Sequence, residues 1–132
     1  MKEKNELDIL IPVFNESETI VETLKNISTV VKCNYRILIC YDYDEDLTLK
    51  IIKKNFSQNS QIVFVKNFSK GFNNALISGF NNSTAEAVLV FMADDHTNHG
   101  MINSCYAKFK EGYHVVCPSR FVKGGKMIGN SL

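Results

Sequence analysis

The stretch Glu86-Ala-Val-Leu-Val-Phe-Met-Ala-Asp-Asp95 decides the fold, because it predicts a strand with both faces buried. Its apolar residues, 87–92, form one short continuous run, which is typical of an inner strand of a parallel sheet. Asp94 and Asp95 follow this strand directly. The carboxyl ends of such strands border the ligand crevice of open α/β sheets, and carboxylate oxygens suit Mg²⁺ or Mn²⁺ beside a phosphate. A solvated turn or a helix cap is the alternative interpretation of the two acids.

Apolar runs of strand length alternate with segments of helical periodicity along the rest of the chain. We expect strands at residues 7–14, 35–41, 61–65, 87–92 and 114–118, and helices at about 15–31, 47–55, 68–80 and 100–110. This alternation predicts a Rossmann-like, doubly wound α/β fold, with a mainly parallel sheet and helices on both faces. A strand order of 3-2-1-4 would gather the ends of strands one, two and four around one crevice.

Capping residues and apolar spacing predict how the helices begin and which side they bury. Asn15, with Glu18 three residues later, is expected to cap the first helix, and Asp46 the second. The third helix is expected to open at Ser69 and to bury Phe72, Leu76 and Phe80, which recur at i, i+4 and i+8. The tail from residue 119 to residue 132 has no period and is expected to be a mobile loop.

Composition excludes several classes of protein. Fifteen basic and fourteen acidic residues leave a net charge of +1, which gives no electrostatic footprint for nucleic-acid binding. The four cysteines lack zinc-site spacing, so we expect free thiols in a reducing cytoplasm. The N-terminal residues lack the apolar core of a signal peptide, and no apolar run is long enough to span a bilayer.

Candidate functional residues collect where the predicted strands end. Strand one ends in Pro12, Phe14, Asn15 and Glu16, strand two in Asp42, Asp44 and Asp46, and strand four in Asp94, Asp95 and His96. Lys70 and Arg120 are cations that could meet a phosphate, although each alone is equally well explained as a surface residue. The chain has no GxGxxG, GxxxxGK[ST] or GxSxG motif, which disfavours a nicotinamide site, a P-loop and a hydrolase elbow.

Five segments, in the same order along the chain, resemble the glycosyltransferase 2-like family. The segments are Ile9-Leu-Ile-Pro-Val-Phe-Asn-Glu16, Ile37-Leu-Ile-Cys-Tyr-Asp-Tyr-Asp-Glu-Asp46, Lys70-Gly71 with Asn74-Ala75 and Gly79, Val88-Leu-Val-Phe-Met-Ala-Asp-Asp95, and Ser119-Arg-Phe-Val-Lys-Gly-Gly-Lys126. The last segment looks like that of dolichol-phosphate mannosyltransferase-like members. The resemblance covers nearly the whole chain.

This resemblance implies a GT-A fold and transfer of a sugar from a nucleotide-sugar, with inversion at the anomeric carbon. Together with the free thiols, which favour a cytoplasmic protein, it implies a place at the membrane surface if the acceptor is a polyprenyl phosphate. Mg²⁺ or Mn²⁺ on the donor diphosphate would be held by Asp94 and Asp95, which are also the implied catalytic residues. The implied nucleotide-sugar-binding residues are Pro12, Phe14, Asn15, Glu16, Asp42, Asp44, Lys70 and Arg120.

Two departures from the family pattern matter. The usual Asp-x-Asp reads Ala93-Asp94-Asp95, so both acids stay candidate metal ligands. Family members also continue well beyond this length, so we expect residues 1–132 to be one domain that forms the N-terminal portion of a longer one. Such a chain is expected to self-associate through apolar surface near the fourth helix and fifth strand, and to transfer little or no sugar.

Two rival functions remain to be weighed. The first is a nucleotide-sugar-binding fragment without catalytic activity, and metal-dependent turnover would separate it from an active enzyme. The second is a receiver-like signalling domain. A receiver needs a phosphoacceptor Asp after its third strand, and here that strand ends in Val65-Lys66-Asn67, which disfavours the receiver.

Overall fold

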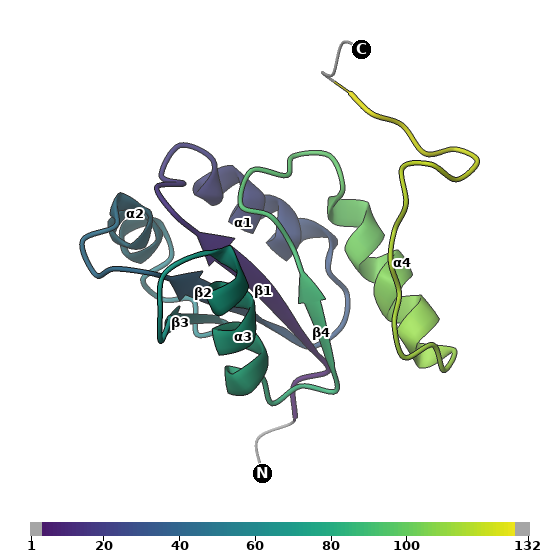
Figure 1. Cartoon of the computed structure of the whole chain (residues 1–132), viewed down its shortest axis with the longest axis horizontal. Helices are drawn as coiled ribbons and strands as arrows, with labels where there is room; N and C mark the ends of the chain where they lie inside the picture. Colours follow the sequence, from purple (N-terminus) through teal and green to yellow (C-terminus); the bar gives the residue numbers. More distant parts are fainter. Residues whose placement is uncertain (1–3, 129–132) are drawn as a thin grey trace.

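The computed structural model describes residues 4–128 as a four-stranded sheet between two layers of helices (Figure 1). All the strand pairs are parallel and the order is β3-β2-β1-β4, so the predicted Rossmann-like fold and strand order are confirmed. The elements are β1 (Leu7–Val13), α1 (Ile20–Val30), β2 (Tyr35–Tyr41), α2 (Leu47–Asn55), β3 (Ile62–Lys66), α3 (Phe72–Asn82), β4 (Ala87–Val90) and α4 (His99–Lys110).

The two faces of the sheet carry different helices. Alternate residues of β1 point to opposite faces, and the strand is buried at every position. Ile9 and Ile11 belong to a core that includes residues of α1, α2 and α4. Leu10 belongs to a second core that contains Ala75 of α3. Within the described residues, α3 is therefore the helix that covers the second face (Figure 1).

Helix α3 buries a different side from the one predicted, although Leu76 is partly buried against the second core as expected. It begins at Phe72, after Gly71 with a φ of +102°, and not at Ser69. Phe72 and Phe80 are 51% and 50% exposed, whereas the buried residues of the helix are Ala75, Ser78 and Gly79. A Cβ atom added at Gly79 would lie 2.1 Å from Leu10 Cδ1, so the helix lies close to the sheet. The residues that α3 buries fully are therefore small, whereas Phe72 and Phe80 stay half exposed.

The start of α1 also differs from the prediction, whereas the start of α2 agrees with it. Asn15 does not cap α1, because it adopts a left-handed φ of +54° and the helix begins five residues later, at Ile20. The N-cap residue of α1 is Thr19, which makes no side-chain capping bond. Asp46 caps α2 as predicted, since its Oδ1 accepts a hydrogen bond of 2.8 Å from the backbone N–H of Thr48.

The predicted fifth strand is absent from the described part of the chain. Residues 114–118 have no regular structure, and Val115 is 80% exposed. β4 is also shorter than predicted, since it ends at Val90 and not at residue 92. It is an edge strand whose residues are only partly buried or exposed, so the prediction of an inner strand with both faces buried is wrong. Pro118 has no N–H to donate to a strand ladder, and four of the five residues in the run 114–118 are exposed. The tail is irregular from residue 119 to residue 128, and the rest of the predicted loop lies outside the described residues.

Apolar side chains are exposed at several places, among them α3 and the tail. Phe68 precedes α3 and is 68% exposed, and Phe121 and Ile128 of the tail are 84% and 82% exposed. Exposed apolar surface of this kind can mediate association between copies of a protein. Self-association therefore stays a prediction, which light scattering can test. Among the described residues, every helix falls short of the length and apolar character that a membrane crossing requires.

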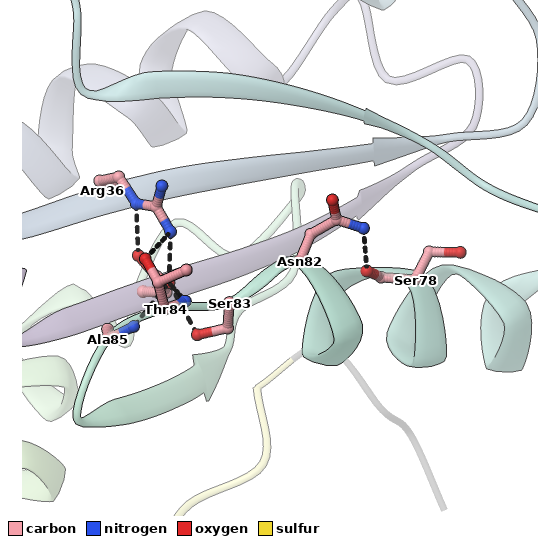
Figure 2. Close-up of polar contacts among 7 residues, drawn as sticks. Arg36, Ser78, Asn82, Ser83, Thr84 and Ala85 are labelled. Atoms are coloured by element: carbon pink, nitrogen blue, oxygen red, sulfur yellow. Dashed lines mark hydrogen bonds and ion pairs between the residues drawn. The ribbon is translucent and has the colours of Figure 1, made fainter.

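Asp8 joins three segments at the end of the sheet opposite to the carboxyl ends of the strands. It is fully buried in β1, and its two carboxylate oxygens accept hydrogen bonds of 2.8 Å from Arg36 Nε and Nη2 in β2. Asp8 Oδ2 also accepts from Ser83 Oγ at 2.7 Å and from the N–H of Thr84 at 3.1 Å. Figure 2 shows Arg36 and residues 83–85 converging at this point. Together these hydrogen bonds form the Asp8 cluster, which holds the turn between α3 and β4 against β1 and β2.

The Asp8 cluster should make stability depend on acid pH. Burial raises the pKa of Asp8, but the hydrogen bonds from Arg36, Ser83 and Thr84 outweigh it and leave the pKa below its ordinary value of 3.8. A lowered folded-state pKa gives stability that is present above the unfolded value and is lost as pH falls toward the folded value. We expect the free energy of unfolding, measured by urea titration, to fall from about pH 5 to about pH 3. The free energy of unfolding should fall less steeply with pH in the Asp8→Asn variant. Equal slopes in the variant and the wild type would contradict the lowered pKa of Asp8.

Candidate active site

The candidate site lies along the carboxyl ends of β1, β2 and β4. β1 stands between β2 and β4 in the sheet, so the segments that follow these three strands begin at one edge. Those segments contain Asn15, Asp42 and Asp94. The topology therefore brings to one edge three polar groups that are far apart in the sequence.

The turn after β1 exposes one aromatic ring and one acid. Pro12 is buried in β1 opposite Cys40, whereas Phe14 is 59% exposed and meets Tyr43 edge to face, with 5.8 Å between the ring centroids. The Tyr43 hydroxyl donates to Asn15 Oδ1. Glu16 Oε2 accepts a hydrogen bond of 3.2 Å from Thr19 Oγ1, the hydroxyl next to the start of α1. The turn thus connects β1 with both the β2–α2 loop and α1.

Asp42 is held by Asn67, which is not among the predicted site residues, and by the backbone of Gly71, whose neighbour Lys70 is. Its Oδ1 accepts a hydrogen bond of 2.8 Å from Asn67 Nδ2, and its Oδ2 accepts one of 3.1 Å from the N–H of Gly71. Asn67 is 8% exposed, and its Oδ1 has no hydrogen-bond partner within residues 4–128. A buried oxygen without a partner is available to an N–H group of a ligand. The sequence signal for Asn67 is its place directly after a buried strand, the same rule that identified Asp42.

Three of the predicted site residues have ordinary surface environments. Asp44 forms an ion pair with Lys66 in which both side chains are more than half exposed, and the hydrogen bond from Lys66 lowers the pKa of Asp44. Lys70 is exposed, and its carbonyl accepts a hydrogen bond of 2.7 Å from Asn74 Nδ2. Arg120 lies in the exposed tail, with its Nη1 3.4 Å from the sulfur of Met127. Their roles at the site remain predictions.

Asp94 and Asp95 have different environments although they are neighbours. Asp95 is partly buried, and its Oδ1 accepts from the N–H groups of Thr97 and Asn98, at 3.0 and 2.9 Å. Burial raises the pKa of Asp95, but the hydrogen bonds from Asn98 and Thr97 outweigh it and lower the pKa. Asp94 is exposed, and no hydrogen bond to its carboxylate is found within the described residues. Asp95 shapes the turn before α4, whereas Asp94 is available to a ligand.

The backbone before Asp94 is fixed by α1. Thr23 is fully buried in α1, and its Oγ1 donates a hydrogen bond of 2.7 Å to the carbonyl of Ala93. A threonine inside a helix gives no sequence signal for this contact, which joins residues 70 positions apart. The contact holds the backbone between β4 and Asp94.

The two acids fit a divalent cation only if a substrate completes the site. Within residues 4–128, no group of three or more His, Cys, Asp or Glu side chains is placed to hold a metal ion. Mg²⁺ is commonly held by one or two carboxylates together with substrate phosphates and water. Asp94, with an exposed carboxylate beside the strand ends, fits this kind of site.

Comparison with known proteins gives both a family and a fold. The profile described as glycosyl transferase family 2 matches residues 8–130. The dolichol-phosphate mannosyltransferase of Pyrococcus furiosus is 28% identical over 122 residues, which are 92% of this chain and 35% of that protein. The undecaprenyl-phosphate 4-deoxy-4-formamido-L-arabinose transferase of Proteus mirabilis is 28% identical over 119 residues, 85% of this chain and 36% of that protein. The chain thus spans little more than a third of the length of these relatives.

A solved structure shares the fold. The crystal structure of S. aureus TarS 1-349 in complex with UDP superposes with a TM-score of 0.65 at 17% identity, over 80% of this chain and 32% of that chain. A second crystal structure of TarS gives a TM-score of 0.67 at 18% identity, with the same coverage. At this identity the likeness concerns the fold alone.

Proposed function

Because the chain belongs to glycosyl transferase family 2, we propose that its sheet edge binds a nucleotide-sugar and that the sugar is transferred from it with inversion. The observation that carries this proposal is the meeting of the β1, β2 and β4 ends at one edge, with the exposed carboxylate of Asp94 among them. Two of the relatives are named as transferases of dolichol phosphate and undecaprenyl phosphate. These names support a polyprenyl phosphate at the membrane surface as the acceptor.

The nucleoside would lie between the turn after β1 and Asp42. Phe14 offers an exposed ring for stacking, and Pro12, Asn15 and Glu16 shape the turn beside it. The Asp42 carboxylate would accept from the base or the ribose. The unpartnered Oδ1 of Asn67, next to Asp42, would accept a second N–H group of the base. Asp44, Lys70 and Arg120 would contact the ribose, the sugar or the phosphates.

The chemistry follows from charge. In the transfer, the bond between the anomeric carbon and the β-phosphate oxygen breaks, and the acceptor oxygen bonds to that carbon from the opposite side. Asp94, with Asp95 beside it, would hold a divalent cation, whose positive charge would stabilise the departing diphosphate. A phosphate-monoester acceptor has its second pKa near about 6, so its oxygen is already ionised at neutral pH and needs no general base.

The matched relatives are much longer than this chain, and this favours a second candidate function. We propose that residues 1–132 form the nucleotide-sugar-binding portion of a longer transferase domain. In that case the chain alone binds the donor without consuming it. An assay of UDP-sugar and GDP-sugar consumption distinguishes the two candidates, because turnover by the 132-residue chain would exclude the binding-only function.

Nucleotide binding should depend on metal and on Asp94. In calorimetry with UDP and with GDP, we expect binding in Mg²⁺ that EDTA abolishes. Asp94→Asn should weaken binding in Mg²⁺ by about tenfold or more, since it removes a charged metal ligand and keeps the side-chain shape. Asp95→Asn should weaken it less, because that carboxylate is engaged by Thr97 and Asn98.

Glu45→Gln is the matched control for these variants, because Glu45 is an exposed acid next to the site. Its affinity should equal that of the wild type. Equal affinity in Mg²⁺ and EDTA would refute the metal role, and failure of both nucleotides to bind would refute the proposed function.

A further inference from the structure

Asp46 and Thr48 reach beyond α2 to the turn after β1. Both residues are fully buried. Asp46 Oδ2 accepts a hydrogen bond of 3.0 Å from the N–H of Asn15, and Thr48 Oγ1 accepts one of 2.8 Å from the N–H of Glu16. Two consecutive backbone amides of the turn are therefore held by side chains from the start of α2.

Capping alone does not account for this arrangement. A helix N-cap needs one acceptor oxygen, and Asp46 uses Oδ1 for it, toward the N–H of Thr48. A serine or an asparagine would cap equally well. The second oxygen and the Thr48 hydroxyl both serve another segment, more than 30 residues earlier in the chain.

The segment that they hold has an uncommon backbone conformation. Asn15 has a φ of +54°, in the left-handed region that residues other than glycine seldom adopt. The residues on either side of it, Phe14 and Glu16, present the exposed ring and the acid of the candidate site. A change in the conformation of Asn15 would redirect both side chains. Fixing this turn before the ligand arrives lowers the entropy lost on binding.

We propose that Asp46 and Thr48 are positioning residues, which hold the Phe14–Glu16 turn in the conformation that binds the nucleoside. This role rests on the proposed function, in which that turn contacts the nucleotide. Asp46 and Thr48 touch no ligand themselves, because both are fully buried beneath the turn. Their loss should therefore weaken nucleotide binding while the direct contacts of the nucleotide remain in the chain.

Variants can separate the positioning role from the helix cap. Asp46→Ser keeps a capping oxygen for α2 but provides no second acceptor for the N–H of Asn15. Thr48→Val removes the acceptor for the N–H of Glu16 and keeps the branched shape, whereas Thr48→Ser keeps the hydroxyl. Glu45→Gln, one residue before Asp46, is the control for removing an exposed charge from the loop.

Amide hydrogen exchange by NMR, without ligand, tests whether the turn is held. Asp46→Ser should speed exchange at Asn15, and Thr48→Val at Glu16, by about tenfold or more. The N–H of Phe56, which donates to the Ile52 carbonyl at the end of α2, should keep its wild-type rate. Thr48→Ser should keep Glu16 protected. Unchanged exchange at both turn amides in the Asp46→Ser and Thr48→Val variants would overturn the proposal.

Titration with UDP and with GDP, each in Mg²⁺, tests whether the held turn matters for binding. Affinity should fall about tenfold in Asp46→Ser and in Thr48→Val and stay at the wild-type value in Thr48→Ser and Glu45→Gln. If the wild type binds and these two variants bind equally well, the positioning role is wrong and the proposed function stands. If neither nucleotide binds the wild type, the proposed function fails and this role fails with it.

Discussion

Asp8→Ala is expected to lower the free energy of unfolding by about 3 kcal/mol, the lower end of the range for breaking a buried ion pair. The substitution leaves the Arg36 guanidinium without the carboxylate that accepts two of its hydrogen bonds. It also removes the acceptor for Ser83 and for the N–H of Thr84. We choose the lower end because the Arg36 side chain is 21% exposed, so water can hydrate part of its unpaired charge.

Urea unfolding followed by circular dichroism measures this loss. Glu111→Ala is the matched control, because it breaks the Lys108–Glu111 pair, in which both side chains are more than half exposed. That control should lose less than about 1 kcal/mol. Replacing both Asp8 and Arg36 by leucine and methionine should recover part of the loss, since no unpaired charge remains. A loss below about 1 kcal/mol for Asp8→Ala would show that the cluster contributes as little as a surface pair.

Gly79→Ala is expected to destabilise the chain by about 2 kcal/mol, although alanine is the better helix former by about 1 kcal/mol. The added Cβ would lie 2.1 Å from Leu10 Cδ1 and 3.0 Å from Cys40 Sγ, and both residues are fully buried. Leu10 cannot rotate away without displacing its neighbours in a close-packed core. The helix would therefore have to move off the sheet.

Gly100→Ala in α4 is the control for this substitution. A Cβ at Gly100 meets nothing within 4 Å, so the same change should stabilise the chain by about 0.5–1 kcal/mol. Thermal or urea unfolding of the two variants gives the comparison. Shortening the opposing side chain, in Gly79→Ala with Leu10→Ala, should relieve the clash at the cost of apolar burial. A stabilised Gly79→Ala variant would contradict the close approach of α3 to the sheet.

The parallel sheet could be predicted because its signals are local and repeated. Each of the four observed strands contains a short apolar run. The polar residues Asn15, Asp42 and Asp94 come within a few residues of the ends of β1, β2 and β4, which the order β3-β2-β1-β4 brings together. The α2 cap could be predicted for the same reason, because Asp46 and Thr48 are two residues apart.

The errors arose where distant contacts decide the outcome. The i, i+4 spacing of Phe72, Leu76 and Phe80 predicts a buried side, but only Leu76 of the three is partly buried. The closest approach of the helix to the sheet is at Gly79, which faces Leu10. The apolar run at 114–118 resembles a strand, yet no described element covers it.

Long-range hydrogen bonds account for what was missed in the candidate site. Asp42 accepts hydrogen bonds from Asn67 and Gly71, which lie in the segment after β3. Thr23 of α1 donates to the carbonyl of Ala93, 70 residues later in the chain. Neither contact has a spacing that a single sequence reveals. The same holds for the second acceptor of Asp46, because a capping signal does not show where the other oxygen points.

Because α3 packs closely on the sheet, the thiol of Cys40 can report local opening of the structure there. Cys40 lies beneath Gly79 with no exposed surface, and burial raises the pKa of its thiol to about 12. Because the thiolate is the reactive form, a thiol reagent can modify Cys40 only after α3 has moved off the sheet. Cys117 is exposed and reacts without such a motion. The rate at which Cys40 is labelled therefore measures how often α3 separates from the sheet while the rest of the chain stays folded.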